Sequence, residues 1–226
     1  MSDLWSTRRR AMAALAGNLR AEAACLEGVF DALDACVGHL LSVRPTSGHE
    51  RTLALFGATL AVKGRNFALG IYGLTLDGLA EEAGALVRPF IETLETLAWL
   101  NQDPSRTELM LSDDRPRAER LAKAVGHEFK DLRDYLNAQA SHLSTSGASV
   151  GHLMRGDRLV LVQPYHKRML RVTMQMIHLF VFRLAVEAAK CASVAGCAPS
   201  EDLANMIDAC RRRFVSVFGE TPVSRG

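Results

Sequence analysis

Hydrophobic residues recur along this chain mostly at three- and four-residue steps, the spacing of a buried face on an α-helix. The first such segment covers residues 4–43 and predicts one long helix, whose apolar face is formed by Leu15, Leu19, Leu26, Val29, Phe30, Leu33, Val37, Leu40 and Leu41. We expect it to end at Arg44-Pro45-Thr46-Ser47-Gly48, because a residue before proline disfavours the helical conformation and glycine interrupts helices.

The same spacing predicts five more helices, over residues 49–76, 79–101, 117–140, 165–195 and 200–218. A glycine inside a helix costs about 1 kcal/mol relative to alanine. The helix at 49–76 nevertheless contains Gly57, Gly64, Gly70 and Gly73, so we expect neighbouring helices to approach it closely. Pro89 predicts a kink or a restart in the helix at 79–101. Residues 101–116 are polar and predict a loop.

One segment departs from the helical pattern. Arg155-Gly156-Asp157 is a turn signal, and the apolar run Leu159-Val160-Leu161-Val162 follows it. We therefore expect a small hairpin or extended excursion near residues 150–163. The sequence has no internal repeat and no linker long enough to separate domains, so residues 1–226 should form a single all-α domain. Its architecture should be an antiparallel bundle of about six helices.

Composition favours a globular helical protein and gives weak evidence about partners. Hydrophobic residues make up 48% of the 226 residues and charged residues 23%, with a net charge of +2 that does not indicate a dedicated nucleic-acid binder. Five cysteines without a CxxC pair are typical of a reduced, cytoplasmic protein. We expect no signal peptide, and the purest apolar run, Leu53–Val62, is shorter than the roughly 20 residues that span a membrane.

Two histidine-containing patterns fall short of functional motifs. His127-Glu128-Phe129-Lys130-Asp131 lacks the second histidine of the HExxH zinc motif, and we expect no metal or other cofactor. Arg171 and His178 lie seven positions apart on one face of a long apolar helix. There we expect a half-buried histidine that is hydrogen-bonded within the bundle.

The candidate site comes from two other segments. Arg133-Asp134-Tyr135-Leu136-Asn137-Ala138-Gln139-Ala140-Ser141-His142 places an arginine, an asparagine and a histidine near one helix end. Arg88 and Glu92 stand four residues apart and are followed by Trp99-Leu100, and this spacing predicts an ion pair. Together these segments resemble the HEPN helical proteins, many of which cleave RNA without a metal. The resemblance covers roughly residues 51–142.

The resemblance implies two readings of function. In catalytic HEPN proteins an arginine precedes the histidine by four to six residues, whereas this chain has Asn137 at that spacing and Arg133 one turn earlier. The first reading is therefore a non-enzymatic HEPN-like protein that forms a homodimer and binds a partner. The alternative is a metal-independent ribonuclease of defence or toxin–antitoxin type. In it His142 would transfer a proton, and Arg133 or Asn137 would contact the phosphate. Arg88 and Glu92 would then order the site. Of the functional readings considered, a metal-dependent enzyme built on a helical bundle ranks third.

Overall fold

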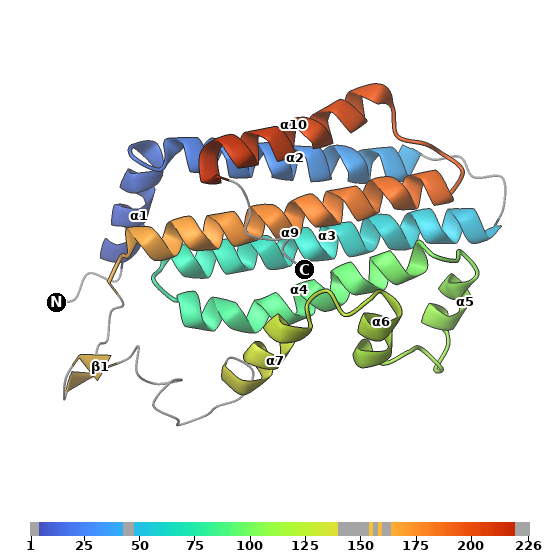
Figure 1. The fold of residues 1–226 in the computed structure, drawn as a ribbon, viewed down its shortest axis with the longest axis horizontal. Helices are drawn as coiled ribbons and strands as arrows, with labels where there is room; N and C mark the ends of the chain where they lie inside the picture. The colour runs from blue at the N-terminus through green and yellow to red at the C-terminus, as the bar shows by residue number, and fades with distance from the viewer. Residues whose placement is uncertain (1–4, 43–47, 140–153, 156–157, 160–163, 220–226) are drawn as a thin grey trace.

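The computed structural model describes residues 5–42, 48–139, 154–155, 158–159 and 164–219, and within them the fold is all-α, as the sequence predicts (Figure 1). The helices are α1 (Ser6–Ala16), α2 (Arg20–Ser42), α3 (Gly48–Leu76), α4 (Ala80–Leu100), α5 (Arg106–Leu111), α6 (Ala118–Ala124), α7 (Lys130–Gln139), α9 (Lys167–Val194) and α10 (Glu201–Phe218). Two short strands, β1 (Met154–Arg155) and β2 (Arg158–Leu159), pair antiparallel where the hairpin is expected.

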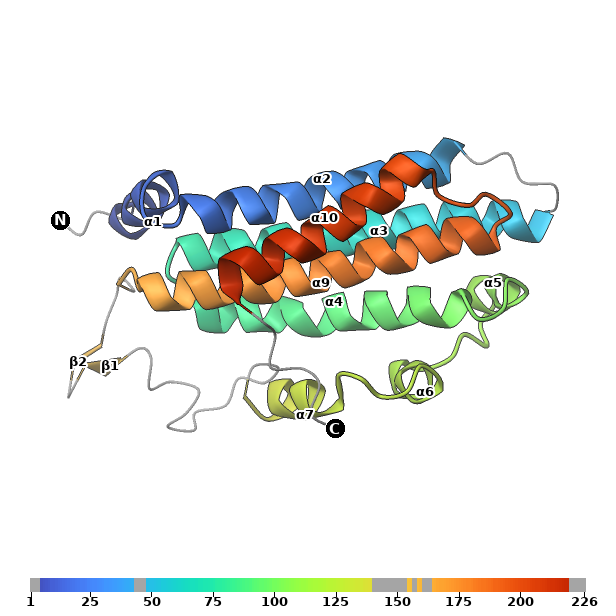
Figure 2. The same cartoon turned by 45° about the horizontal axis from the view of Figure 1, so that its top comes forward.

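Four long helices, α2, α3, α4 and α9, form the central bundle. Helix α9 packs against the other three, and α10 lies across α2 and α9 (Figure 2). The short helices α6 and α7 pack on the outer side of α4, away from the bundle centre. Helix α3 packs against α2, α4 and α9 through one face. Its exposed residues lie on the opposite face.

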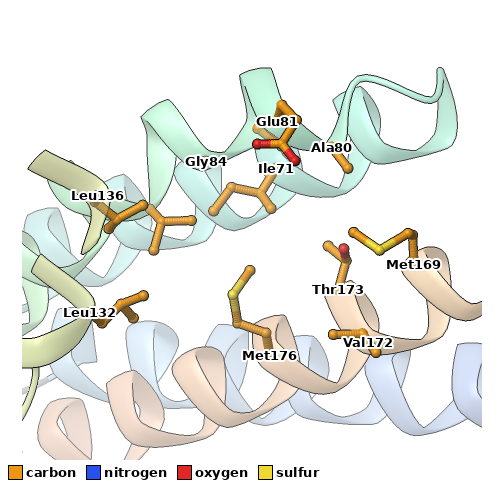
Figure 3. Close-up of a pocket in the computed structure, with 12 residues that line it drawn as sticks. Ile71, Ala80, Glu81, Gly84, Leu132, Leu136, Met169, Val172, Thr173 and Met176 are labelled. Carbon is orange, nitrogen blue, oxygen red and sulfur yellow. The ribbon is translucent and has the colours of Figure 1, made fainter. Parts of the chain in front are cut away.

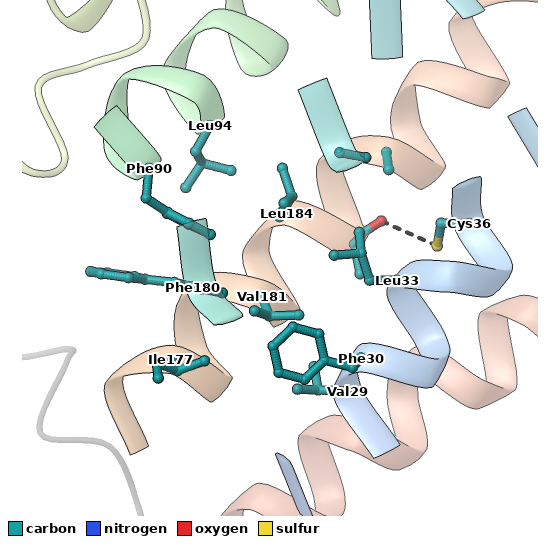
Figure 4. Close-up of a cluster of buried hydrophobic side chains, with 14 of the residues drawn as sticks. Val29, Phe30, Leu33, Cys36, Phe90, Leu94, Ile177, Phe180, Val181 and Leu184 are labelled. Carbon is teal, nitrogen blue, oxygen red and sulfur yellow. Dashed lines mark hydrogen bonds between the residues drawn. The ribbon is translucent and has the colours of Figure 1, made fainter. Parts of the chain in front are cut away.

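The core is shared by the four long helices, and large apolar side chains of α2, α4 and α9 form part of it (Figure 4). The rings of Phe90 and Phe180 stack with their centroids 5.3 Å apart. All five cysteines are free thiols and four are buried, so they act mainly as small apolar residues. The thiol of Cys36 donates to the carbonyl oxygen of Ala185 over 3.5 Å, which satisfies that donor inside the core.

Three of the four glycines of α3 lie at close contacts with a neighbouring helix, as predicted. A Cβ added at Gly57, Gly64 or Gly70 would come within 2.5, 2.5 and 2.8 Å of Cys191, Leu184 and Leu86. A Cβ at Gly73 would meet nothing within 4 Å, so the expectation was wrong at that residue. The missing side chains therefore let α9 and α4 approach α3.

Two of the expected long helices are each divided. The helix expected at 4–43 breaks after Ala16, where Gly17 adopts φ −109° and ψ −104°. The helix expected at 117–140 breaks between α6 and α7, where Gly126 and His127 have positive φ angles of 92° and 54°. Apolar spacing continues across both breaks, so periodicity alone did not reveal them.

The other boundaries deviate less from expectation. Helix α5 lies inside the predicted loop at 101–116. Helix α4 continues through Pro89 as one element rather than restarting there. The side-chain oxygen of Ser200 accepts from the backbone N–H of Leu203 over 3.3 Å, so Ser200 caps the N-terminus of α10. Among the described helices, α9 alone has the length and apolar character of a membrane span, but half of that stretch is buried within the bundle.

Candidate functional site

Arg133 of α7 joins two carboxylates of α4. Its Nη1 donates to Oε2 of Glu95 over 2.7 Å, and its Nη2 donates to Oε1 of Glu92 over 3.4 Å. The Arg133 side chain is 12% exposed and that of Glu95 only 2% exposed. The three groups therefore form a largely buried charge network that ties α7 to the middle of α4.

Glu95 is the most constrained member of this network. Burial raises the pKa of its carboxyl group, and the positive charge of Arg133 opposes that shift without cancelling it. Its Oε1 has no hydrogen-bond partner among the described residues. A buried carboxylate of this kind needs its cation, because an unpaired charge in the interior costs several kcal/mol.

Arg88 completes the network from the solvent side. Its Nε donates to Oε1 of Glu92 over 3.0 Å, so the ion pair predicted from the four-residue spacing is confirmed. Glu92 thus accepts from both Arg88 and Arg133 through the same oxygen. The fold thus brings two arginines that lie 45 positions apart in the sequence to the same carboxylate oxygen.

A polar pocket of about 360 Å³ opens beside these arginines, between α4, α6 and α7. Its lining is formed by Arg88, Ala118, Glu119, Ala122, His127, Lys130, Arg133 and Asp134. Three basic side chains and two carboxylates line it, so the lining carries a small positive excess. Glu92 and Glu95, which bind its arginines, do not belong to this lining. We call this cavity the polar pocket.

His127 occupies an unusual backbone conformation at the rim of this pocket. Its φ of 54° lies in the left-handed region, which non-glycine residues rarely adopt. The backbone N–H of His127 donates to the carbonyl oxygen of Ala122 over 2.8 Å, and its own carbonyl accepts from Lys130 over 3.0 Å. These bonds hold the turn between α6 and α7 and place the half-buried imidazole at the pocket. Residues with such a conformation cluster at functional sites.

The structure describes only part of the site expected from the resemblance. Arg133, Arg88 and Glu92 come together as stated above. Asn137 belongs to α7, but its side chain lies outside the described part of the chain, and His142 lies outside it altogether. The geometry of the expected histidine relative to Arg133 therefore stays a prediction.

The second arginine–histidine pair differs from its expectation. His178 is 1% exposed rather than half-buried, and neither ring nitrogen has a hydrogen-bond partner among the described residues. Burial lowers the pKa of its imidazole to about 4. Aromatic rings from α9 and α10 surround it, with the Phe214 centroid 4.9 Å away. Arg171 instead pairs with Glu22 over 2.8 Å.

Within the described ranges, no three His, Cys, Asp or Glu side chains gather closely enough to hold a metal ion. The side chains that line the polar pocket can support ionic recognition or proton transfer. Lys130 and Arg88 can attract an anionic group, and His127 can donate or accept a hydrogen bond. In the sequence, His127 stands out only as part of an incomplete zinc motif. Nothing in the sequence identifies Lys130, Glu119 and Asp134 as site residues, because no spacing rule links them to Arg88.

No known family model matches the chain, no curated protein is similar to it, and no solved structure matches its fold.

Proposed function

We propose that this chain is a non-catalytic helical protein that forms a homodimer and acts by binding a partner. The dimer part of the proposal is carried by one observation, an exposed apolar stripe on α3. Leu55, Val62 and Leu69 recur at seven-residue steps on this helix and are 53%, 41% and 41% exposed. Single exposed apolar residues are common on protein surfaces, but a regular row along one helix favours an interface.

The spacing of the row matches a helix–helix seam. Leu55, Thr59, Val62, Asn66 and Leu69 follow alternating steps of four and three residues, the repeat of a coiled-coil contact face. None of these five residues is charged. The hydroxyl of Thr59 donates to the carbonyl oxygen of Leu55 over 2.8 Å, so it is already satisfied within the helix. A polar residue such as Asn66 in this position commonly fixes the register between paired helices.

Cationic side chains frame the stripe without entering it. Lys63 lies over the ring of Phe67, with Nζ 5.9 Å from the centroid, on one side of Val62. Arg65 lies over Phe30 of α2 and forms an ion pair with Asp34 over 2.7 Å. The uncharged row is thus bordered by two cations that already have partners, Lys63 within α3 and Arg65 on α2. This pattern of an apolar centre and a polar rim is typical of protein interfaces.

A second copy of the chain is the occupant that this surface fits best. Symmetric homodimers use the same patch on both subunits. Val62 is the midpoint of the stripe, with Leu55 and Leu69 seven residues to either side. A two-fold axis near Val62 would therefore bring the two stripes together over their full length.

The charge network supports the non-catalytic part of the proposal. Arg133 is the arginine that a ribonuclease reading needs at the scissile phosphate. Its guanidinium is mostly buried and is engaged by Glu95 and Glu92. A phosphate would have to compete with two carboxylates for the same cation. Arg133 therefore fits a structural role better than a direct contact with RNA.

Metal-independent RNA cleavage is the second candidate, and the polar pocket is the observation that favours it. The pocket gathers Arg88, His127 and Lys130 beside Arg133, a set that can bind a phosphate and move a proton. Under this alternative, His142 remains the expected proton-transfer residue.

Incubation of the purified protein with single-stranded RNA in the presence of EDTA separates the two candidates. We expect no cleavage. Robust cutting that disappears in both the His142→Ala and the Lys130→Ala proteins, with the melting temperature unchanged, would establish the ribonuclease instead. Cutting that survives both substitutions would indicate a contaminating nuclease and would leave the binding proposal standing.

Cysteine cross-linking tests the dimer surface. In a Val62→Cys protein, oxidation should produce a covalent dimer, because paired helices 8–10 Å apart bring facing residues within reach of a disulfide. Val215→Cys is the matched control, since Val215 is 45% exposed on α10 and lies outside the stripe. Equal cross-linking of the two variants would refute the α3 interface.

A further inference from the structure

A second, apolar pocket lies between the N-terminal half of α4, α7 and the first turns of α9, with α3 behind it (Figure 3). Its volume is about 220 Å³. It shares no lining residue with the polar pocket and does not include the stripe on α3. We infer that this apolar pocket binds a small hydrophobic amine, with its apolar body inside the pocket and its ammonium group at Glu81.

The floor of the apolar pocket is buried hydrocarbon. Ile71, Ala83, Val87 and Leu136 line it and are at most 4% exposed. These residues come from α3, α4 and α7, so three separate elements close the bottom of the pocket. A cavity of about 150 Å³ with such a lining can hold a benzene ring. The present volume therefore admits one aromatic ring together with a short chain.

The mouth of the pocket is lined by apolar side chains that are exposed to solvent. Met169 and Val172 of α9 are 45% and 50% exposed, although both side chains turn towards the pocket. Met176 lies next to them and faces Leu132 of α7. Methionine side chains are flexible and polarizable, so they adapt to ligands of differing shape. An apolar ligand would cover side chains that are otherwise in contact with water.

Polar groups are few and lie on facing sides of the pocket. Of the described residues that line it, Glu81 alone carries a charge, and its carboxylate makes no ion pair within the described part of the chain. Across from it, Thr173 of α9 is 7% exposed, and its hydroxyl has no hydrogen-bond partner among the described residues. A carboxylate favours a cation, and a free hydroxyl can accept an N–H bond. Together they select a protonated amine over a carboxylate or phosphate.

The small size of the pocket argues against a macromolecular occupant. A helix or strand of another protein needs a groove that extends along several turns or residues. This pocket is bounded by α7 at one end and by the start of α4 at the other. A ligand with a compact apolar body and one polar end matches both its size and its distribution of polar groups.

Phenethylamine, phenethyl alcohol and hydrocinnamate are suitable probes, because they share an aromatic ring and differ in the charge of a short chain. In a ligand-detected NMR titration of the full chain, phenethylamine should bind saturably at one site. It should bind about three- to fivefold more tightly than the alcohol, as expected for an exposed ion pair. Hydrocinnamate should bind more weakly than either.

Two pairs of variants locate the site. Val172→Trp should fill the mouth and abolish binding of the amine and the alcohol, while Val215→Trp on α10 should leave both unchanged. Glu81→Gln should reduce the affinity for the amine to that for the alcohol. Glu82→Gln is its control, since Glu82 shares the first turn of α4 but does not line the pocket. Because Val172 and Glu81 are exposed, the variants should keep the wild-type melting temperature.

Several outcomes would overturn the inference. Absence of saturable binding by both the amine and the alcohol would show that no small ligand enters the pocket. Binding that persists in Val172→Trp would place the site elsewhere. Hydrocinnamate binding as tightly as phenethylamine would exclude the proposed role of Glu81. None of these results depends on the oligomeric state or on RNA cleavage.

Discussion

Arg133 and Glu95 form an ion pair between α7 and α4, with Nη1 donating to Oε2 over 2.7 Å at a carboxylate that is 2% exposed. Replacing Arg133 by methionine should lower the free energy of unfolding by about 3 kcal/mol, because it leaves a buried carboxylate without its cation. Urea denaturation measures this change. Arg211→Met is the control, since the Arg211 side chain is 69% exposed beside Asp208 and should matter by less than about 0.5 kcal/mol.

The double variant Arg133→Met/Glu95→Met completes this test. If the loss comes from the stranded charge, removing the carboxylate as well should restore most of the stability. Equal destabilisation in the single and double variants would instead assign the effect to packing of the arginine side chain.

The glycines of α3 provide a matched pair. Gly57→Ala should destabilise the protein by about 1–3 kcal/mol, because the new Cβ would lie 2.5 Å from the Sγ of buried Cys191. Gly73→Ala should instead stabilise it by up to about 1 kcal/mol, since nothing lies within 4 Å and alanine favours the helix. Thermal melts of the two proteins should therefore shift in opposite directions. A shift in the same direction would contradict the helix approach described above.

His178 should make the protein less stable as the pH falls. Burial lowers its pKa to about 4 in the folded state, whereas the unfolded side chain titrates near 6.5. Between these values the unfolded state binds the extra proton, so the free energy of unfolding decreases from pH 6.5 towards pH 4. The contribution of this residue amounts to about 3 kcal/mol.

The variant His178→Leu isolates that effect. It removes two ring nitrogens that lack hydrogen-bond partners among the described residues, so it should be at least as stable as the wild type at pH 7. The stability difference between the two proteins should widen as the pH is lowered from 6.5 to 4. A constant difference across that range would show that His178 does not titrate as described.

The sequence predicted the helical elements well where apolar periodicity was uninterrupted. The bounds of α3, α9 and α10 lie within about two residues of expectation. It failed at Gly17 and at Gly126-His127, where the hydrophobic spacing continues although the backbone turns. A glycine within an apolar stripe is compatible with either a helix or a break, so only tertiary packing decides between them.

Only the part of the candidate site that lies within one helix was predictable from the sequence. The Arg88–Glu92 pair follows from helix geometry, because residues four apart share a face. The contact of Arg133 with Glu92 and Glu95 depends on how α7 packs on α4, and no spacing in the sequence specifies that. The burial of His178 was underestimated for a similar reason, since α10 covers it with Phe214 and Phe218.

The molar mass in solution tests the central claim, that two copies pair through the stripe on α3. Light scattering at micromolar concentration should give twice the 24.7 kDa of one chain for the wild type and for Val215→Lys. Val62→Lys should give 24.7 kDa, because it places a charge at the middle of the apolar seam. A wild type of 24.7 kDa, or a Val62→Lys protein that remains a dimer, would contradict the account.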